Sequence, residues 1–150
     1  MAYFIFAKDS DNIDNTLYRI AENQSDLINL NIDQSVYKII EESQSNFDLV
    51  KYGVKNAQKY NGDIITYIDI SYEYLFLNKN QLNSYVQNVI SVIKEFLDKN
   101  KKHPSFNLWN NYCNQLKLLD LNNITYPLNK SLEQYIKEQD QTSLNPLQLP

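Results

Sequence analysis

The apolar residues of this chain change their spacing near Asn78, and this change constrains the fold more than any other feature. Before Asn78 they come in short bursts rich in Tyr, Ile and Val, at residues 2–7, 16–21 and 36–40. Such bursts are typical of strands. Beyond Asn78 the apolar residues follow the i, i+3, i+4, i+7 spacing of helices. The sequence therefore predicts an α+β fold, with a small antiparallel sheet followed by helices.

The clearest local signal in the first half is Asn61-Gly62, which lies between segments 55–60 and 63–70. Asn-Gly favours the positive φ values of a two-residue type I′ turn, so we predict an antiparallel hairpin. The second arm should present alternate residues to opposite faces. One face would carry Ile64, Thr66, Ile68 and Ile70, and the other Ile65, Tyr67 and Asp69.

A short helix is predicted between the third strand and the hairpin. Ser45-Asn46-Phe47-Asp48 resembles a capping box, in which a hydroxyl accepts a hydrogen bond from a backbone N–H of the first turn. Gly53 would fall at the end of this helix. Its apolar residues would be Phe47, Val50 and Val54.

The second half predicts an antiparallel pair of helices. Asn78 or Asn80 suits the start of the first helix, and Pro104 suits the first turn of the second, after a short break at residues 100–103. The first apolar stripe consists of Leu82, Tyr85, Val86, Val89, Ile90, Ile93, Phe96 and Leu97. The second consists of Phe106, Trp109, Tyr112, Cys113, Leu116 and Leu119.

The last thirty residues predict a short helix and an extended arm. Residues 126–128 should be extended because a proline disfavours a helical residue before it, and residues 131–134 should open a brief helix. The arm, residues 141–150, is uncharged and carries Leu144, Leu147 and Leu149. These leucines dock on the chain itself or lie in a groove of another subunit. We expect one domain over residues 1–150, with a β-rich part (1–77), an α-hairpin (78–121), and a short helix with the arm (122–150).

Two glycines, one histidine and one cysteine argue against most catalytic and metal sites. A phosphate-binding loop needs several glycines, and metal or nucleophilic sites need clustered ligands or paired acid–base groups. The net charge of −4 and a single arginine, Arg19, argue against a nucleic-acid partner. No stretch has the roughly 20 apolar residues of a membrane span. We predict a non-enzymatic protein without cofactor, nucleic-acid or membrane partners.

An acidic segment invites comparison with a calcium loop. Asp9, Asp11 and Asp14 have the spacing of the first EF-hand ligands. An EF-hand also needs glycine at its sixth position and glutamate at its twelfth, where this chain has Asp14 and Ile20. We predict an acidic loop between two strands.

Other titratable residues favour structural over catalytic roles. His103 follows lysines at a helix junction and should face solvent, and Cys113 lies on an apolar stripe as a small buried residue. On a straight helix the two would lie about 15 Å apart, too far for a catalytic pair. The glutamates that could supply a carboxylate pair are expected on solvated faces; they are Glu41, Glu42, Glu73, Glu95 and Glu133.

Tyrosines gather around the predicted hairpin, at Tyr52, Tyr60, Tyr67, Tyr72 and Tyr74. Tyrosine offers a large amphipathic contact area, which makes it common at interfaces, although the same residues could line a partly covered sheet. Together with the arm, they give the predicted partner-binding residues Tyr67, Tyr72, Tyr74, Leu144, Leu147 and Leu149.

Several scattered stretches resemble a known class of protein. They are MAYFIF at 1–6, LYRIAEN at 17–23, His103-Pro104 with Trp109, Tyr112 and Leu116, ITYPLN at 124–129, SLEQY at 131–135, and NPLQLP at 145–150. They resemble small virion or tail-associated proteins of contractile-tailed bacteriophages, particularly marine phages of cyanobacteria. The strand-then-helix layout is more loosely similar to tail-fibre assembly chaperones.

The resemblance implies a virion or tail structural protein that acts through contacts with other virion or tail proteins, or with copies of itself. It would be found in the virion or the host cytoplasm. The alternatives are a tail-fibre assembly chaperone and a host-directed inhibitor protein. The resemblance implies no catalytic residues.

Overall fold

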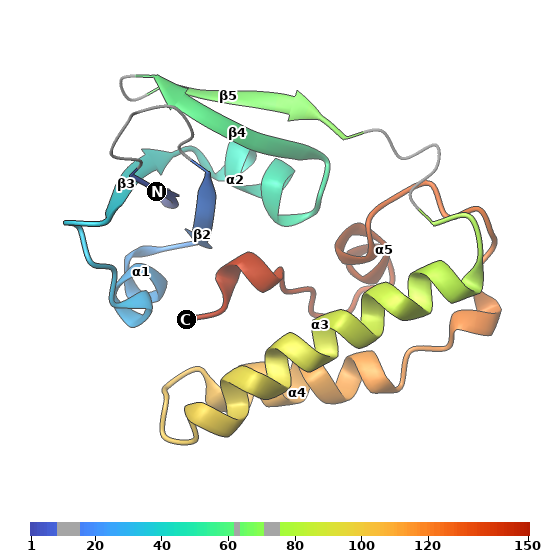
Figure 1. The fold of residues 1–150 in the computed structure, drawn as a ribbon. Coiled ribbons are helices and arrows are strands. Elements are labelled where there is room, and N and C mark those ends of the chain that lie inside the picture. Colours follow the sequence, from blue (N-terminus) through green and yellow to red (C-terminus); the bar gives the residue numbers. More distant parts are fainter. Residues whose placement is uncertain (9–15, 62–63, 71–75) are drawn as a thin grey trace. The chain divides into compact units, whose positions relative to one another are not determined.

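The computed structural model describes residues 1–8, 16–61, 64–70 and 76–150 and has the predicted α+β architecture (Figure 1). The chain divides into two compact units. One comprises Met1–Ile70 with Leu147–Pro150, and the other comprises Ser71–Pro146. The β-rich part therefore forms one unit together with the last four residues.

The first unit contains a three-stranded antiparallel sheet, in the order β2-β1-β3. Its strands are β1 (Ala2–Ala7), β2 (Leu17–Ala21) and β3 (Tyr37–Glu42), which confirms the three predicted strands. Phe4 of the central strand pairs with Ile20 on one side and Ile40 on the other. Phe4 and Ile5 point to opposite faces and are both fully buried, so β1 is covered on both faces, which explains why it is apolar along nearly its whole length.

One short helix connects β2 to β3, and a second follows β3. Helix α1 (Gln24–Leu30) was not predicted, because none of its residues is buried and no apolar stripe marks it. Helix α2 (Gln44–Lys51) was predicted, but its N-cap is Ser43 rather than Ser45: the Ser43 hydroxyl accepts from the Asn46 N–H. Val54 lies beyond the helix end.

Gly53 ends α2 as predicted. Its φ of 67° is in the left-handed region, where a side chain is unfavourable. The Gly53 N–H donates to the Val50 carbonyl, and the Val54 N–H donates to the Leu49 carbonyl. This pair of bonds is a Schellman motif, which satisfies the last carbonyls of the helix.

The predicted hairpin is confirmed as a separate two-stranded sheet, β4 (Lys55–Asn61) and β5 (Ile64–Asp69). The described residues thus form two sheets where we expected one. Asn61 pairs with Ile64, so the connection consists of residues 62–63 rather than 61–62. Those two residues, and with them the predicted turn type, lie outside the described part of the chain.

The hairpin packs onto the first sheet and α2 through one face. Ile65 is 7% exposed and belongs to the core of this unit, whereas Ile64 on the other face is 75% exposed. This confirms the predicted alternation along β5. The core comprises Ala2, Phe4, Phe6, Ile20, Ile40, Phe47, Val50, Ala57 and Ile65.

The second unit is built on α3 (Lys79–Lys99) and α4 (Phe106–Lys117), which pack side by side (Figure 1). Asn78 is the N-cap of α3, as predicted, and its side chain accepts from the Gln81 N–H. Both apolar stripes face inward. The buried residues are Leu82, Val86, Val89, Ile90, Ile93, Phe96 and Leu97 on α3, and Trp109, Tyr112, Cys113 and Leu116 on α4. Pro104 lies before the N-cap, Ser105, and not inside the first turn.

The rest of this unit follows as short elements. A 3-10 turn η1 (Leu121–Asn123) precedes a non-helical stretch, in which Leu128 bridges Phe76. The predicted extended segment 126–128 contains a bend at Tyr126 and Pro127, whose peptide bond is cis. Helix α5 (Leu132–Glu138) begins at the predicted place, where the Ser131 hydroxyl accepts from the Gln134 N–H at 3.0 Å. The arm is not extended throughout, because Pro146–Gln148 forms a second 3-10 turn, η2. No helix of the described residues has the length and apolarity needed to cross a bilayer.

Candidate functional site

Tyr67, a predicted partner-binding residue, lies on the inner face of β5. Its hydroxyl donates to Glu42 Oε2 at 3.2 Å, and its ring stands edge-on to Phe4 with centroids 6.3 Å apart. Burial and the nearby Glu42 carboxylate raise the pKa of Tyr67, which keeps its hydroxyl protonated as a donor. Tyr67 therefore packs within its own unit. Tyr72 and Tyr74 lie outside the described residues.

The three arm leucines dock on the chain itself in this structure. Leu144 and Leu149 are buried, and Leu147 is partly buried against the core of the first unit. Arg19 Nε donates to the Leu149 carbonyl at 2.6 Å, which fixes the end of the arm. The sequence left open whether these leucines pack on the chain itself or in a groove of another subunit. In the described conformation they pack on the chain itself.

Arg19 belongs to an aromatic cluster that sequence reasoning missed. Tyr18 and Tyr37 stack with centroids 4.2 Å apart, and the Arg19 guanidinium lies 4.3 Å from the centre of the Tyr18 ring. The two tyrosines pair because they lie on β2 and β3, the two neighbours of β1. The guanidinium is engaged by the Tyr18 ring and the Leu149 carbonyl, so its role is structural.

His103 is half-buried, in contrast to the solvent-facing position that we expected. Its ring stands edge-on to Phe96 at 5.5 Å, and its Nδ1 accepts from the Ser105 N–H at 3.0 Å. The Ser105 side chain makes no capping hydrogen bond, so the His103 ring satisfies an N–H at the start of α4 instead. Cys113 is buried on the α4 stripe, as predicted.

The predicted acidic loop, with Asp9, Asp11 and Asp14, lies outside the described residues. Within the described part of the chain, no group of three or more His, Cys, Asp or Glu side chains is placed to hold a metal ion.

Glu133 corrects the expectation that the candidate glutamates lie on solvated faces. Glu133 is only 5% exposed, and its Oε1 accepts a hydrogen bond from the Tyr85 hydroxyl at 2.8 Å. The Ser143 hydroxyl donates to the Glu133 backbone carbonyl at 2.8 Å. Of the others, Glu41 and Glu95 are exposed, Glu42 is half-buried beneath Tyr67, and Glu73 lies outside the described residues.

Burial dominates the electrostatics around Glu133. It raises the pKa of the Glu133 carboxyl, although the Tyr85 hydrogen bond opposes the shift. Burial and the Glu133 charge also raise the pKa of Tyr85 and of Tyr112, which is hydrogen-bonded to Ser143 and Leu144. One buried network thus receives a polar side chain from each of α3, α4, α5 and the arm. We call it the Glu133 network, and it consists of Tyr85, Tyr112, Glu133 and Ser143.

A perturbed acid in a cluster is a candidate catalytic group, so the Glu133 network must be weighed as an active site. Glycoside hydrolysis needs two carboxyl groups flanking a substrate, and a general acid must reach the group it protonates. The Glu133 network contains one carboxyl, and the residues around it leave it almost without contact with solvent. Its geometry fits a structural role that joins three helices to the arm.

Two other features of the described surface are open to a partner. The first is the outer face of β5, where Ile64 is 75% and Ile68 is 40% exposed and Thr66 lies between them. The sheet has two strands, so among the described residues the other edge of β5 has no strand partner.

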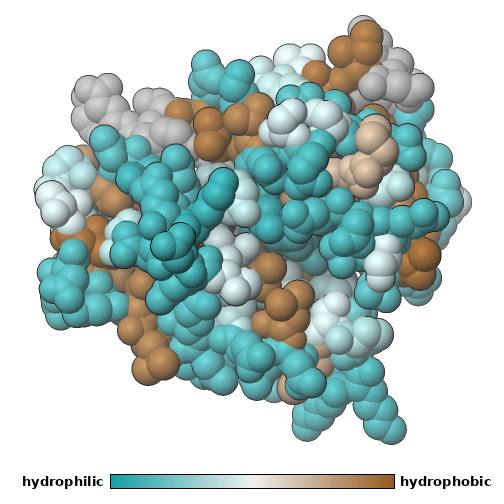
Figure 2. Space-filling model, turned by 180° about the vertical axis from the view of Figure 1, so that it is seen from behind, coloured by the Kyte–Doolittle hydropathy of each residue, from teal (hydrophilic) through white to brown (hydrophobic). Residues whose placement is uncertain are grey.

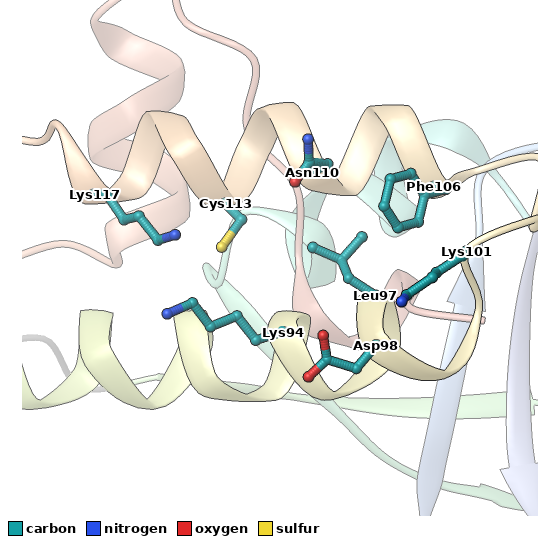
Figure 3. A pocket seen from close by; sticks show the side chains of 8 residues that line it. All are labelled: Lys94, Leu97, Asp98, Lys101, Phe106, Asn110, Cys113 and Lys117. Atoms are coloured by element: carbon teal, nitrogen blue, oxygen red, sulfur yellow. The ribbon is translucent and has the colours of Figure 1, made fainter.

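The second is a groove of about 440 Å³ between α3 and α4 (Figure 3). Figure 3 shows Lys94 and Lys117 reaching into the same end of the groove from the two helices, with Cys113 beside them. Lys101, Asp98 and Phe106 lie toward the other end. The lining residues are Lys94, Leu97, Asp98, Lys101, Phe106, Asn110, Cys113 and Lys117.

Comparison of the chain with protein-family models, with curated proteins and with solved structures finds no match.

Proposed function

We propose that this chain is a non-enzymatic structural component of a bacteriophage virion or tail, and that it acts through contacts with other proteins. The phage setting comes from the resemblance of scattered sequence stretches. The observation that carries the contact role is the outer face of β5, on which Ile64 and Ile68 are exposed on a strand with an unpaired edge in the described part of the chain.

Such an edge can pair with a strand of another protein through its backbone, while side chains on its face add apolar contact. Together, the exposed parts of Ile64 and Ile68 amount to slightly more than one fully exposed isoleucine. Burying them would contribute roughly 2–3 kcal/mol, or a factor of about 30–150 in a dissociation constant. Two isoleucines would thus strengthen an interface without being sufficient to form one.

The remaining contact area would be of mixed character. On the face seen in Figure 2, apolar residues form small separate areas among hydrophilic ones. Interfaces between proteins that also exist apart are about as polar as the rest of the surface, so this distribution is compatible with reversible assembly.

Mass spectrometry of purified particles tests the proposal. We expect the chain in mature particles at a fixed copy number. Absence from mature particles contradicts the proposal. In that case co-purification with a fibre protein would select the chaperone, and recovery at one-to-one stoichiometry with a host enzyme would select the inhibitor.

The surface itself is tested with matched variants. Ile64→Glu should lower incorporation into particles at least tenfold, while Ile28→Glu should leave it unchanged, because Ile28 is similarly exposed (68%) but lies on α1. Both variants should retain the wild-type circular dichroism spectrum and melting temperature. Equal incorporation of the two variants would contradict the assignment to β5.

A further inference from the structure

The groove between α3 and α4 differs in charge from the chain as a whole. The chain carries a net charge of −4, yet the groove is lined by three lysines, Lys94, Lys101 and Lys117, and one acid, Asp98. Among the described residues, none of these three ammonium groups lies within ion-pair distance of a carboxylate. The groove therefore presents unneutralised positive charge on an acidic protein.

The arrangement of the lysines favours an anion at one end of the groove. Lys94 and Lys117 project toward that end from opposite helices, so two like charges share it without a carboxylate between them (Figure 3). An anionic group placed between the two ammonium groups adds two attractions that offset their mutual repulsion. Lys101 follows the end of α3 and lines the other end of the groove, where Asp98 also lies (Figure 3).

Part of the lining is apolar, beside the polar residues Asp98 and Asn110. Leu97 and Cys113 are buried, and Phe106 is half-buried, so its ring is the apolar surface that a ligand can still cover. The groove is open to solvent, which suits an extended segment better than an enclosed small molecule.

We propose that this groove binds an acidic segment of a partner protein, in which an apolar side chain lies close to a carboxylate. The carboxylate contacts the Lys94–Lys117 pair, and the apolar side chain packs on Phe106. The inference rests on the proposed function, because it names the chemistry of one partner of an assembly protein.

Binding of a synthetic peptide to the isolated full-length chain tests this inference. The probe is a fluorescein-labelled peptide, GEELFEEG, measured by fluorescence anisotropy in 50 mM and 200 mM NaCl. We expect saturable binding that weakens at the higher salt concentration, as exposed charge contacts are screened. A peptide with both apolar residues replaced by serine should bind at least fivefold more weakly. Absence of binding up to 1 mM overturns the inference.

A matched pair of variants separates the groove from general attraction to lysines. Lys94→Gln with Lys117→Gln should weaken binding at least tenfold. Lys99→Gln with Lys102→Gln removes the same charge nearby but outside the groove lining, and it should change binding less than twofold. Lys99 is paired with Glu95 at 3.0 Å, so its charge is already engaged. Equal weakening by the two double variants overturns the inference.

A second probe separates a protein segment from another polyanion. Inorganic polyphosphate should compete with the peptide more weakly than unlabelled peptide at equal charge, because it cannot cover Phe106. Competition as strong as that of the peptide overturns the assignment to an acidic protein segment. These measurements require no phage particle. Failure of peptide binding with normal incorporation into particles rejects the groove alone, and absence from particles rejects the proposed function.

Discussion

Replacing Tyr85 by phenylalanine removes one hydroxyl from the Glu133 network and tests whether that network stabilises the second unit. The hydroxyl donates to Glu133 Oε1 at 2.8 Å, and the Glu133 residue is 5% exposed, so water cannot readily take over the lost bond. A buried group that loses its hydrogen-bond partner costs about 1–3 kcal/mol. We expect Tyr85→Phe to lower the free energy of unfolding by about 2 kcal/mol at pH 8.

The cost should depend on pH. Burial raises the pKa of Glu133 above its ordinary value of 4.5, so the folded state binds this proton more tightly than the unfolded state. Protonation of Glu133 therefore stabilises the folded state fully below pH 4.5. This stabilisation is lost as the pH rises through the pKa that Glu133 has in the folded state. Hydrogen bonds to charged groups are stronger than neutral ones, so Tyr85→Phe should cost about 1 kcal/mol at pH 4.5, less than at pH 8.

Urea unfolding monitored by circular dichroism at both pH values measures these costs. Tyr135→Phe is the control, since the Tyr135 hydroxyl makes no hydrogen bond to a described residue, and it should change the free energy by less than about 0.5 kcal/mol. Tyr85→Phe in a Glu133→Gln background should show a smaller cost that is independent of pH. The reasoning is refuted if Tyr85→Phe matches Tyr135→Phe at both pH values.

Three further changes test the fold. Gly53→Ala should cost about 1–2 kcal/mol in urea unfolding, because φ is 67° at this position; a neutral effect would contradict the left-handed assignment. Ile65→Ala should cost about 2–4 kcal/mol and Ile64→Ala less than about 0.5, since the first is buried and the second exposed; equal costs would mean that β5 faces the other way. Deleting residues 142–150 should lower the melting temperature and solubility, because the arm leucines lie in the chain's own body; a soluble deletion variant with unchanged melting would place them outside it.

Local chemistry made the long helices and two of the N-caps predictable. Asn78 and Ser131 are side chains that accept hydrogen bonds from the first turn of a helix, and both do so. The apolar stripes of α3 and α4 repeat over several turns, so their period is unambiguous. Helix α1 lacks this signal, because it buries no residue and is defined by the Asn23 cap and the left-handed Asn31 at its ends.

The Glu133 network could not be predicted, because its members come from distant parts of the chain. Tyr85 is 48 residues from Glu133, and Ser143 is ten residues beyond it. In sequence, Glu133 occupies the first turn of a short helix, where a glutamate ordinarily faces water and favours the positive end of the helix dipole. Its burial follows from how α3 and the arm pack against α5.

The proximity of the groove lysines could not be predicted from the sequence, for a related reason. An antiparallel pair of helices was expected, but which residues face each other depends on how far one helix slides along the other. Lys94 and Lys117 belong to different helices and lie 23 positions apart, and their meeting at one end of the groove is a result of packing. The sequence alone shows them as two solvated charges.

The arm is held by the chain itself in this structure. Its backbone is hydrogen-bonded by side chains of both units, through Arg19 to the Leu149 carbonyl and through Gln115 to the Thr142 carbonyl. Its leucines are covered by the chain, so in this conformation they complete the two units rather than offer apolar surface. The described surfaces that we propose for recognition are the exposed isoleucines of β5 and the lysines between α3 and α4. One supplies apolar area and the other supplies charge, and a partner that uses both would need a strand and an acidic segment.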